Sequence, residues 1–242
     1  MQPELQPVAE VAALLIASDY DGTLAPIVAD PAAAHPDPEA IAALRDLSGL
    51  PGTYVAVISG RARADLEDLL GPVPGAVLIG GHGGEWNDAE TTEEAAALES
   101  RLQEVAAEFP GALIEPKPTG AAFHYRQVND EDAADAARLA IEAASEMATR
   151  VVHGKRVVEF STTHADKGSA LQRLRDEIAP DLTVFIGDDA TDEDGFDALG
   201  PTDVGIKVGP GPSAARWSVA DQSDVAPLLA ELAGLRRAAV DR

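Results

Sequence analysis

The sequence predicts an α/β fold, a doubly wound, Rossmann-like parallel sheet into which a smaller α+β domain is inserted. Short apolar runs alternate with helical segments at both ends of the chain, which is typical of a parallel sheet. The middle of the chain instead has the order helix, two strands, helix, two strands (αββαββ). We therefore expect residues 1–88 and 161–242 to form the larger domain and residues 89–160 the inserted one.

The elements before the insertion follow from apolar runs and turn residues. Residues 11–17 are apolar throughout, as in a parallel strand that is buried on both faces. Glycine and proline within residues 49–52 indicate a turn between a helix and the next strand. The expected strands are 11–17, 54–58 and 76–79, and the expected helices are 36–47 and 62–70.

The inserted segment suits an antiparallel sheet that is covered on one face by two helices. Its last two strands flank Gly154 and Lys155 as a hairpin. We expect helices at 92–109 and 131–147 and strands at 112–115, 121–125, 150–153 and 156–160. After the insertion the expected elements are a helix at 167–178, strands at 183–186 and 204–208, and a helix at 225–235.

Composition and charge narrow the classes of partner. The chain has 242 residues and a net charge of -24, which argues against nucleic acid and against an anionic membrane surface. No stretch is long and apolar enough to span a bilayer, and residues 1–10 resemble no signal peptide. The absence of cysteine excludes a disulfide framework and thiolate metal sites, and it fits a cytoplasmic location.

The negative charge also bears on the substrate. An anionic substrate would be repelled unless positive charge is concentrated around its binding site. The chain has only four lysines, and three of them lie in the motifs described below: Lys117, Lys155 and Lys167, with Lys207 outside them. The alternative is an acidic, solvated surface with scattered lysines.

Polar side chains lie where the predicted strands and one helix begin or end. Asp19 and Asp21 follow the first strand, Ser59 follows the second, Lys167 opens a helix, and Asp188 follows a later strand. In open α/β sheets, ligands bind at the carboxyl edge of the strands. Two carboxylates this close repel unless a cation or a shared proton relieves them. This set can serve a phosphoryl group. One carboxylate would attack phosphorus, Mg²⁺ on oxygen ligands would neutralise charge, a second carboxylate would act as acid/base, and a hydroxyl and an ammonium would hold the phosphate oxygens.

Each of these residues also has an ordinary structural explanation. Asp19, Asp21 or Ser59 could cap a turn or helix, Lys167 could be solvated, and Asp188 could serve a turn. Because these explanations require several coincidences in one order along the chain, the set as a whole favours a phosphatase.

The same stretches resemble the ordered motifs of the haloacid-dehalogenase-like phosphatase superfamily. They are residues 19–24, 57–61, 166–168 and 187–193. The resemblance covers nearly the whole chain, and it makes the larger domain the catalytic core and the insertion its cap. It implies that Asp19 is the nucleophile and a magnesium ligand. It implies that Asp21 is the general acid/base and gives its carbonyl to the metal.

The resemblance implies further roles in the core. Ser59, Gly60 and Lys167 would bind the phosphate group. Asp188 would bind magnesium, and Asp189 and Asp192 would support it without contacting the ion themselves.

The inserted domain resembles the cap of trehalose-6-phosphate phosphatases. The matching stretches are 115–117, 124–126 and 154–155 with Glu159, and residues 81–83 with Glu85 resemble the segment before that cap. The resemblance implies hydrolysis of trehalose 6-phosphate to trehalose and phosphate, through an aspartyl-phosphate, in trehalose biosynthesis. The residues it implies in binding this sugar phosphate are Arg61, His82, Glu115, Lys117, Arg126, Lys155 and Glu159.

Alternatives stay open at this point. Glu115 and Lys117 could form a surface ion pair of little energetic value. After Glu159 the family often carries a basic residue and a proline, whereas residues 160–164 read Phe-Ser-Thr-Thr-His, so another phosphorylated disaccharide or glycoside, such as sucrose 6-phosphate, is the runner-up substrate. A non-enzymatic phosphoacceptor switch would need neither Asp21 nor a cap, and a sugar-binding remnant would not need the full motif set. The sequence specifies neither protein partners nor oligomeric state.

Overall fold

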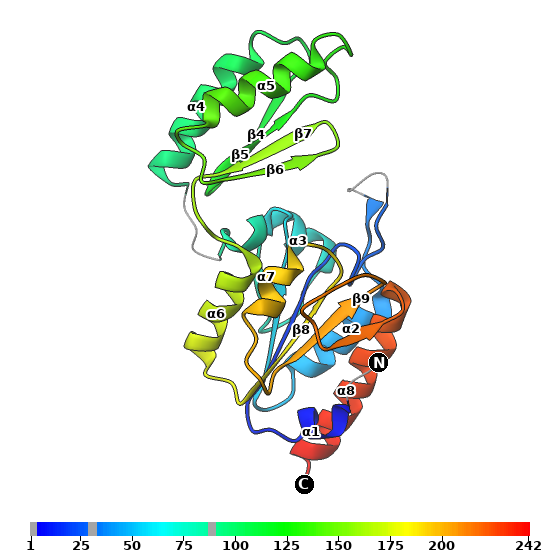
Figure 1. Cartoon of the computed structure of the whole chain (residues 1–242). Helices are drawn as coiled ribbons and strands as arrows, with labels where there is room; N and C mark the ends of the chain where they lie inside the picture. The colour runs from blue at the N-terminus through cyan, green and yellow to red at the C-terminus, as the bar shows by residue number, and fades with distance from the viewer. Residues whose placement is uncertain (1–3, 29–32, 87–90) are drawn as a thin grey trace. The chain divides into compact units, whose positions relative to one another are not determined.

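The computed structural model describes residues 4–28, 33–86 and 91–242, which group into two compact units (Figure 1). The first unit comprises the described residues of 1–87 and 166–242, and the second those of 88–165. The identification of the first as a catalytic core and of the second as a cap stays a prediction.

The first unit is built on a six-stranded sheet in the order β10-β9-β8-β1-β2-β3, and each pair of neighbours is parallel. The strands are β1 Leu14–Ser18, β2 Thr53–Ile58, β3 Val77–Ile79, β8 Leu182–Gly187, β9 Val204–Val208 and β10 Trp217–Val219. All five residues of β1 are buried, as expected of a strand that is covered on both faces. The predicted fold class is confirmed.

Helices cover both faces of this sheet. They are α1 Leu5–Ala9, α2 Pro38–Ser48, α3 Arg63–Leu70, α6 Lys167–Ile178, α7 Asp192–Asp197 and α8 Val225–Val240. Leu14 and Ile16 of β1 pack in one apolar layer with α1, α2, α3 and α8, whereas Leu15 and Ala17 pack in the other with α6 and α7. The sequence did not predict α1, α7 or β10, because elements of three to six residues carry too few positions for a periodic pattern.

The second unit has a four-stranded antiparallel sheet in the order β4-β5-β7-β6. Its strands are β4 Leu113–Lys117, β5 Gly120–His124, β6 Arg150–Gly154 and β7 Val157–Ser161, and its helices are α4 Glu93–Ala106 and α5 Ala133–Ala144. Phe123, Val158 and Phe160 pack against Leu98 and Leu102, which confirms that the helices cover one face.

The β6–β7 hairpin differs in one detail from the prediction. Gly154 pairs with Val157, so the turn residues are Lys155 and Arg156, one position later than expected. Arg156, the second of the two turn residues, has a φ of 64°, in the left-handed region.

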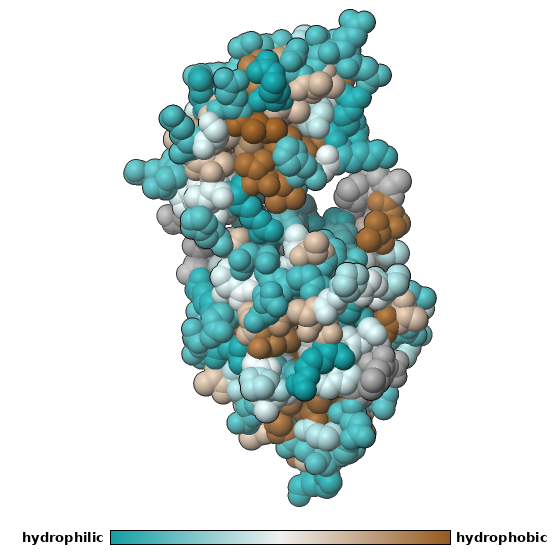
Figure 2. Space-filling view, in the orientation of Figure 1, coloured by the Kyte–Doolittle hydropathy of each residue, from teal (hydrophilic) through white to brown (hydrophobic). Residues whose placement is uncertain are grey.

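None of the described helices has both the length and the apolar composition needed to cross a membrane. The face of the molecule in Figure 2 is mostly hydrophilic, with hydrophobic side chains in separate small areas.

A buried arginine links the last helix to the start of the sheet. Arg236 of α8 is 2% exposed, and its guanidinium donates hydrogen bonds at the amino ends of β1 and β2. The acceptors are the carbonyl oxygens of Ala9, Val11, Ala12, Pro51 and Gly52 and the hydroxyl of Thr53. Because a buried polar group without a partner is costly, the guanidinium and these carbonyls stabilise one another.

We expect Arg236→Met to lower the free energy of unfolding by about 2–4 kcal/mol, because several buried carbonyls lose their donor. Urea denaturation followed by circular dichroism measures the loss. The control is Arg237→Met: the side chain of Arg237 is 53% exposed and forms a surface ion pair with Asp46. That variant should change the free energy by less than about 0.5 kcal/mol. Equal losses in the two variants would contradict the role given to Arg236.

Candidate active site

The strand register gathers the predicted site residues of the first unit at one edge of the sheet. Ser18, the last residue of β1, pairs with Val57 of β2 and with Ile186 of β8. The residues that follow these strands, Asp19, Ser59 and Asp188, therefore emerge at the same carboxyl edge.

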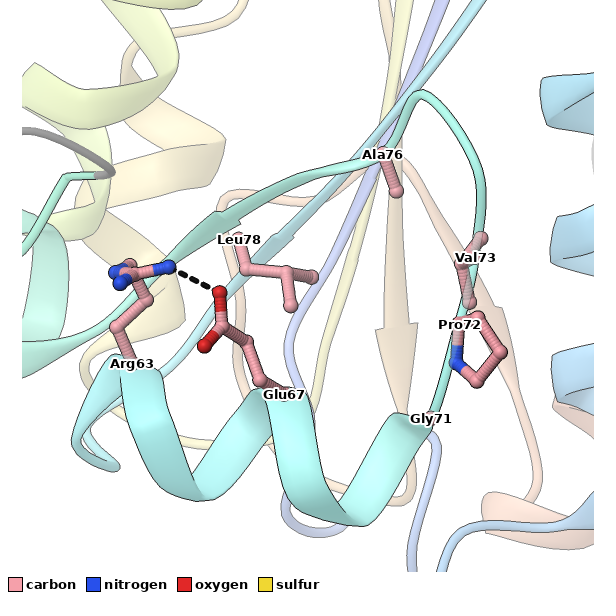
Figure 3. Close-up of a pocket in the computed structure, with 7 residues that line it drawn as sticks. All are labelled: Arg63, Glu67, Gly71, Pro72, Val73, Ala76 and Leu78. Carbon is pink, nitrogen blue, oxygen red and sulfur yellow. Dashed lines mark hydrogen bonds and ion pairs between the residues drawn. The ribbon is translucent and has the colours of Figure 1, made fainter.

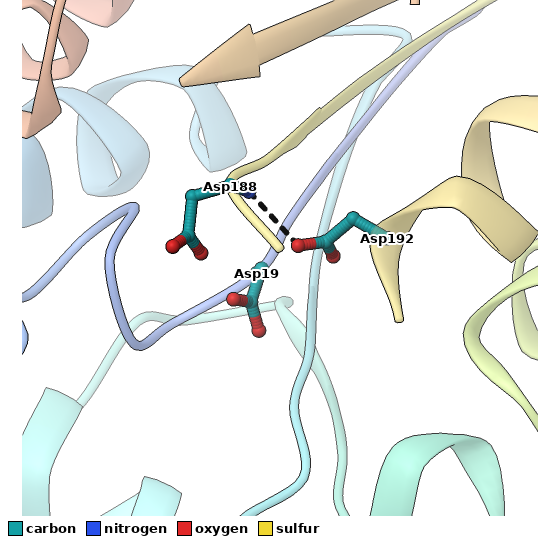
Figure 4. A group of neighbouring side chains, drawn as sticks. All are labelled: Asp19, Asp188 and Asp192. Carbon is teal, nitrogen blue, oxygen red and sulfur yellow. Dashed lines mark hydrogen bonds between the residues drawn. The ribbon is translucent and has the colours of Figure 1, made fainter. Parts of the chain in front are cut away.

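Three carboxylates meet at this edge (Figure 4). Asp19, Asp188 and Asp192 each offer an oxygen atom, and these atoms lie within 4.8 Å of one another. The Oδ2 atom of Asp192 accepts hydrogen bonds from the main-chain N–H groups of Asp188 at 2.9 Å and Asp189 at 3.0 Å. Asp192, at the start of α7, therefore shapes the loop that carries Asp188.

Lys167 joins two of these carboxylates. Its Nζ lies 2.8 Å from Oδ1 of Asp19 and 2.8 Å from Oδ1 of Asp192, and the side chain is 2% exposed. Lys167 is the first residue of α6, and Asp166 before it caps the helix through a capping box with Ser169. This N-cap fixes residue 167 as the first residue of α6, so the side chain of Lys167 enters the carboxylate cluster.

Burial and mutual repulsion shift the proton affinities of the cluster. Burial raises the pKa of Asp19 well above its ordinary range and also raises the pKa of Asp192, in both cases against the charge of Lys167. Burial and the charges of Asp192 and Asp189 raise the pKa of Asp188 to about 6. Burial alone would lower the pKa of Lys167, but the charges of Asp19 and Asp192 raise it. The carboxylates are thus incompletely neutralised, which favours a bound cation.

The oxygen atoms present fit a hard divalent cation. The Oδ1 atom of Asp188 is buried and has no hydrogen-bond partner among the described residues, so it is available as a ligand. Gly22, in the loop after β1, allows this loop to approach the carboxylate of Asp188. The φ of Gly22 is +80°, and a Cβ atom on this residue would lie 2.1 Å from Oδ2 of Asp188. Among the described side chains, Asp19, Asp188 and Asp192 form a carboxylate group that could contact such an ion, and main-chain carbonyls could add ligands.

Asp21 pairs with Arg61. The guanidinium Nε and Nη2 atoms of Arg61 donate to the two carboxylate oxygens of Asp21 at 2.6 and 2.7 Å. The hydrogen bond with Asp21 also raises the pKa of Arg61. The structure therefore places Arg61 beside the predicted acid/base residue.

Ser59, Gly60 and His82 form a neighbouring loop cluster. The Ser59 hydroxyl oxygen accepts from the main-chain N–H of Arg61 at 3.2 Å, and the Ser59 carbonyl accepts from that of His82 at 2.8 Å. A Cβ atom on Gly60 would lie 2.5 Å from the imidazole ring of His82, so glycine allows this contact. Among the described contacts, Ser59 has a turn-capping role and no bond to the acidic cluster.

Asp189 and Lys207 make further contacts at this edge. The Asp189 carboxylate accepts hydrogen bonds from the N–H and the hydroxyl of Thr191, both at 2.8 Å. Although burial opposes the shift, the charge of Lys167 and these hydrogen bonds lower the pKa of Asp189. Lys207, near the end of β9, is buried and donates to the carbonyl oxygen of Asp188. Lys207 is a functional candidate beyond the sequence-based predictions, and the usable signal for it was a lysine in an otherwise apolar strand.

Three of the predicted cap residues, together with His124, form two pairs on the open face of the second sheet, the face that its helices do not cover. Nζ of Lys117 lies 3.1 Å from Oε2 of Glu159, and Nε2 of His124 lies 2.8 Å from Oε2 of Glu115. Glu115 and Glu159 are both opposite Ala122 of the central strand β5, so they share one row of the sheet. Within the described residues, Arg126 and Lys155 are exposed and bond to neither pair.

A pocket of about 410 Å³ lies beside α3 and β3 in the first unit (Figure 3). It is lined by Arg63, Glu67, Gly71, Pro72, Val73, Ala76 and Leu78, and Arg63 and Glu67 form an ion pair with each other. Its lining holds one carboxylate, Glu67, whereas three carboxylates meet at the carboxyl edge of the sheet.

Residues 17–226 match the trehalose-phosphatase family, a range that includes every candidate site residue named above. The chain belongs to this family. By its name, the family consists of phosphatases, which are phosphoric monoester hydrolases.

Named relatives agree with this assignment. The bifunctional trehalose-6-phosphate synthase/phosphatase of Thermoproteus tenax is 35% identical over 231 residues, which cover 90% of this chain and 32% of that protein. The trehalose-phosphate phosphatase of Mycobacterium marinum is 37% identical over 207 residues, 78% of this chain and 52% of that protein. The chain therefore spans about half or less of the length of these relatives.

Solved structures with the same fold include two fungal proteins. The C-terminal domain of the C. albicans trehalose-6-phosphate phosphatase has a TM-score of 0.70 and 26% identity, and the match covers 95% of each chain. The Aspergillus fumigatus trehalose-6-phosphate phosphatase has a TM-score of 0.69 and 30% identity, over 95% of this chain and 96% of that one.

We expect a hard divalent cation such as Mg²⁺ to stabilise the protein against thermal unfolding at pH 7. At roughly a hundredfold excess over its dissociation constant, the cation should add about 2.7 kcal/mol to the free energy of unfolding. Because the pKa of Asp188 is raised to about 6, protons compete for this ligand, and the increment should shrink as the pH falls through that value. Thermal unfolding with the cation and with EDTA measures the increment.

Asp188→Asn is the variant that tests this site. Without a cation, the raised pKa makes the folded protein bind a proton more tightly than the unfolded chain, so the contribution of Asp188 to stability falls as the pH rises from 3.8 to about 6. Without the cation at pH 7, Asp188→Asn should therefore be more stable than the wild type. It should also lose most of the gain in the free energy of unfolding that the cation gives the wild type. Sodium chloride at matched ionic strength controls for screening of the net charge of -24. An undiminished increment in the variant would exclude Asp188 as a ligand.

Proposed function

We propose that the chain is a Mg²⁺-dependent phosphatase that hydrolyses trehalose 6-phosphate to trehalose and inorganic phosphate, a reaction of trehalose biosynthesis. The observation that carries the proposal is the contact of Lys167 with both Asp19 and Asp192, beside Asp188, in a chain of the trehalose-phosphatase family. This set provides a carboxylate nucleophile, a fixed cation for phosphate oxygens and a metal site in one place.

In the first step, a carboxylate oxygen of Asp19 attacks phosphorus and an aspartyl-phosphate forms. The bond between phosphorus and the sugar oxygen breaks, and its electron pair stays on that oxygen. Asp21 gives the oxygen a proton, so that trehalose leaves as a neutral alcohol. In the second step, water gives a proton to Asp21 and attacks phosphorus, which releases phosphate and regenerates the Asp19 carboxylate.

Lys167 and the metal support this chemistry electrostatically. The Lys167 ammonium lies beside Asp19, where it would hold a phosphate oxygen and supply the positive charge that the acidic chain otherwise lacks. Ser59 and Gly60, at the end of β2, are the proposed further phosphate-binding residues. Asp19, the Asp21 carbonyl and Asp188 would hold Mg²⁺, which neutralises charge on the phosphoryl oxygens, while Asp192 and Asp189 orient the loop.

The second unit is proposed to bind the sugar. Its open sheet face presents donors and acceptors in pairs, Lys117 with Glu159 and His124 with Glu115, which suits the many hydroxyl groups of a disaccharide. Arg126, Lys155 and His82 are proposed as further contacts from the family resemblance. A cytoplasmic location stays a prediction that the cysteine-free composition supports.

Asp19→Asn should abolish turnover of trehalose 6-phosphate, because an amide oxygen is a poor nucleophile, with at least about a thousandfold loss in kcat. Phosphate release with Mg²⁺ and with EDTA measures the effect, and circular dichroism checks the fold. The matched control is Asp176→Asn, an exposed carboxylate of α6 that accepts from Gln172 and should leave activity unchanged. Near-normal activity in Asp19→Asn would remove Asp19 from the nucleophile role.

Replacing Lys117 or Glu159 by Ala should raise KM for trehalose 6-phosphate about tenfold, because each change removes hydrogen bonds that are proposed to bind sugar hydroxyls. The same variants should hydrolyse p-nitrophenyl phosphate, which has no sugar, like the wild type. Arg101→Ala on the helix side of the second unit is the control, since its ion pair with Glu104 is on the surface. If the variants hydrolysed both substrates less efficiently and to the same extent, Lys117 and Glu159 would have a structural role instead of a sugar-binding one.

Another phosphorylated disaccharide or glycoside, such as sucrose 6-phosphate, is the second candidate substrate. The departure of residues 160–164 from the family pattern favours testing it. A comparison of kcat/KM for a panel of sugar phosphates decides between the two. The proposal of trehalose 6-phosphate fails if another member of the panel is clearly preferred.

A further inference from the structure

We propose that Arg61 is a positioning residue that holds the carboxyl group of Asp21 in the orientation in which its protonated form gives a proton to the leaving sugar oxygen. This inference rests on the proposed phosphatase activity. It gives Arg61 a role beyond the substrate contact that the family resemblance implies.

The geometry between the two side chains is that of a two-point clamp. Nε of Arg61 donates to Oδ2 of Asp21 at 2.6 Å, and Nη2 donates to Oδ1 at 2.7 Å. Two parallel bonds from a planar guanidinium fix both the position and the rotation of a carboxylate, whereas a single bond leaves rotation free. An ammonium group of lysine would supply the charge without this orientation.

Arg61 itself is anchored on several sides. Its main-chain N–H donates to the Ser59 hydroxyl at 3.2 Å, and its carbonyl accepts from the N–H of Gly81 at 2.9 Å. Its guanidinium lies over the ring of Tyr20, 5.1 Å from the ring centre. Tyr20 is fully buried, and its hydroxyl donates to the carbonyl of Ala34 at 2.7 Å. The clamp is therefore built on fixed parts of the first unit.

The exposed fractions of the two side chains also support a positioning role for Arg61. The side chain of Arg61 is 12% exposed, but that of Asp21 is 39% exposed. The arginine thus holds the carboxylate from the interior and leaves part of it accessible to a reacting group. Because Asp21 directly follows Tyr20 and precedes the turn at Gly22, its main chain is also fixed, by the 2.7 Å hydrogen bond from the Gly22 N–H to the Ala25 carbonyl.

A positioned acid matters only when the leaving group needs a proton. The alcohol oxygen of trehalose is a poor leaving group without protonation, whereas p-nitrophenolate is a good one. The value of kcat/KM reports the steps up to the departure of this group, so it isolates the first transfer from the later hydrolysis of the aspartyl-phosphate.

The test is therefore the loss of kcat/KM in Arg61→Ala on the two substrates, trehalose 6-phosphate and p-nitrophenyl phosphate. We expect a loss of about 10- to 100-fold on the sugar phosphate and less than about threefold on the aryl phosphate. Inhibition by inorganic phosphate should change little. Arg61→Lys should recover little of the loss, because it restores the charge without the two-point clamp.

Two further variants separate positioning from structure. In an Asp21→Asn background, Arg61→Ala should cause almost no additional loss on trehalose 6-phosphate, because Arg61 acts through Asp21. Arg63→Ala is the matched control, since this arginine two positions later pairs with Glu67 and should retain wild-type kinetics on both substrates.

The outcomes are distinct. Equal losses on the two substrates, together with weaker inhibition by phosphate and recovery in Arg61→Lys, would overturn positioning and make Arg61 a phosphate ligand. Full additivity with Asp21→Asn would overturn it as well, and this result does not depend on the stability of one variant. If the wild type hydrolyses the aryl phosphate but none of the sugar phosphates, the proposed function fails, and the inference fails with it.

Discussion

The buried contact of Lys167 with Asp19 and Asp192 is the interaction on which the site depends. The Lys167 ammonium lies 2.8 Å from a carboxylate oxygen of each aspartate, and each of the three side chains is at most 5% exposed. None of these charged groups could be buried alone without a large desolvation cost. The contact also joins the end of β1, the start of α6 and the start of α7. Removal of one member would therefore leave uncompensated charge and would loosen the elements that carry the others.

The parallel sheet places these groups where chemistry can occur. Its register gathers Asp19, Asp188 and Lys207 at the carboxyl edge, although they lie far apart in the sequence. The chain carries a net charge of -24, yet Lys167, Lys207 and Arg61 are all buried or half-buried at this edge. Local positive charge beside the carboxylates would allow an acidic protein to accept an anionic phosphate ester, the proposed substrate class.

The second unit has one apolar and one polar face on its sheet. One face of its sheet is covered by α4 and α5, and the other presents charged and polar side chains in hydrogen-bonded pairs. Pairing keeps these groups in defined positions without a ligand, and a sugar with many hydroxyl groups can replace such bonds one for one. The family membership and this surface together support a sugar phosphate as the substrate class.

The sequence by itself determined the element order, the parallel sheet with its insertion and the polar residues at the strand ends, because hydrophobic periodicity and turn residues are local signals. Residues such as Lys167 at the start of α6 were predictable for the same reason. Only the tertiary structure decided that Asp192 rather than Asp189 enters the carboxylate cluster, that Arg61 clamps Asp21, and that Arg236 is buried. These partners come from separate elements, and their pairing depends on how the elements pack, which no local pattern records.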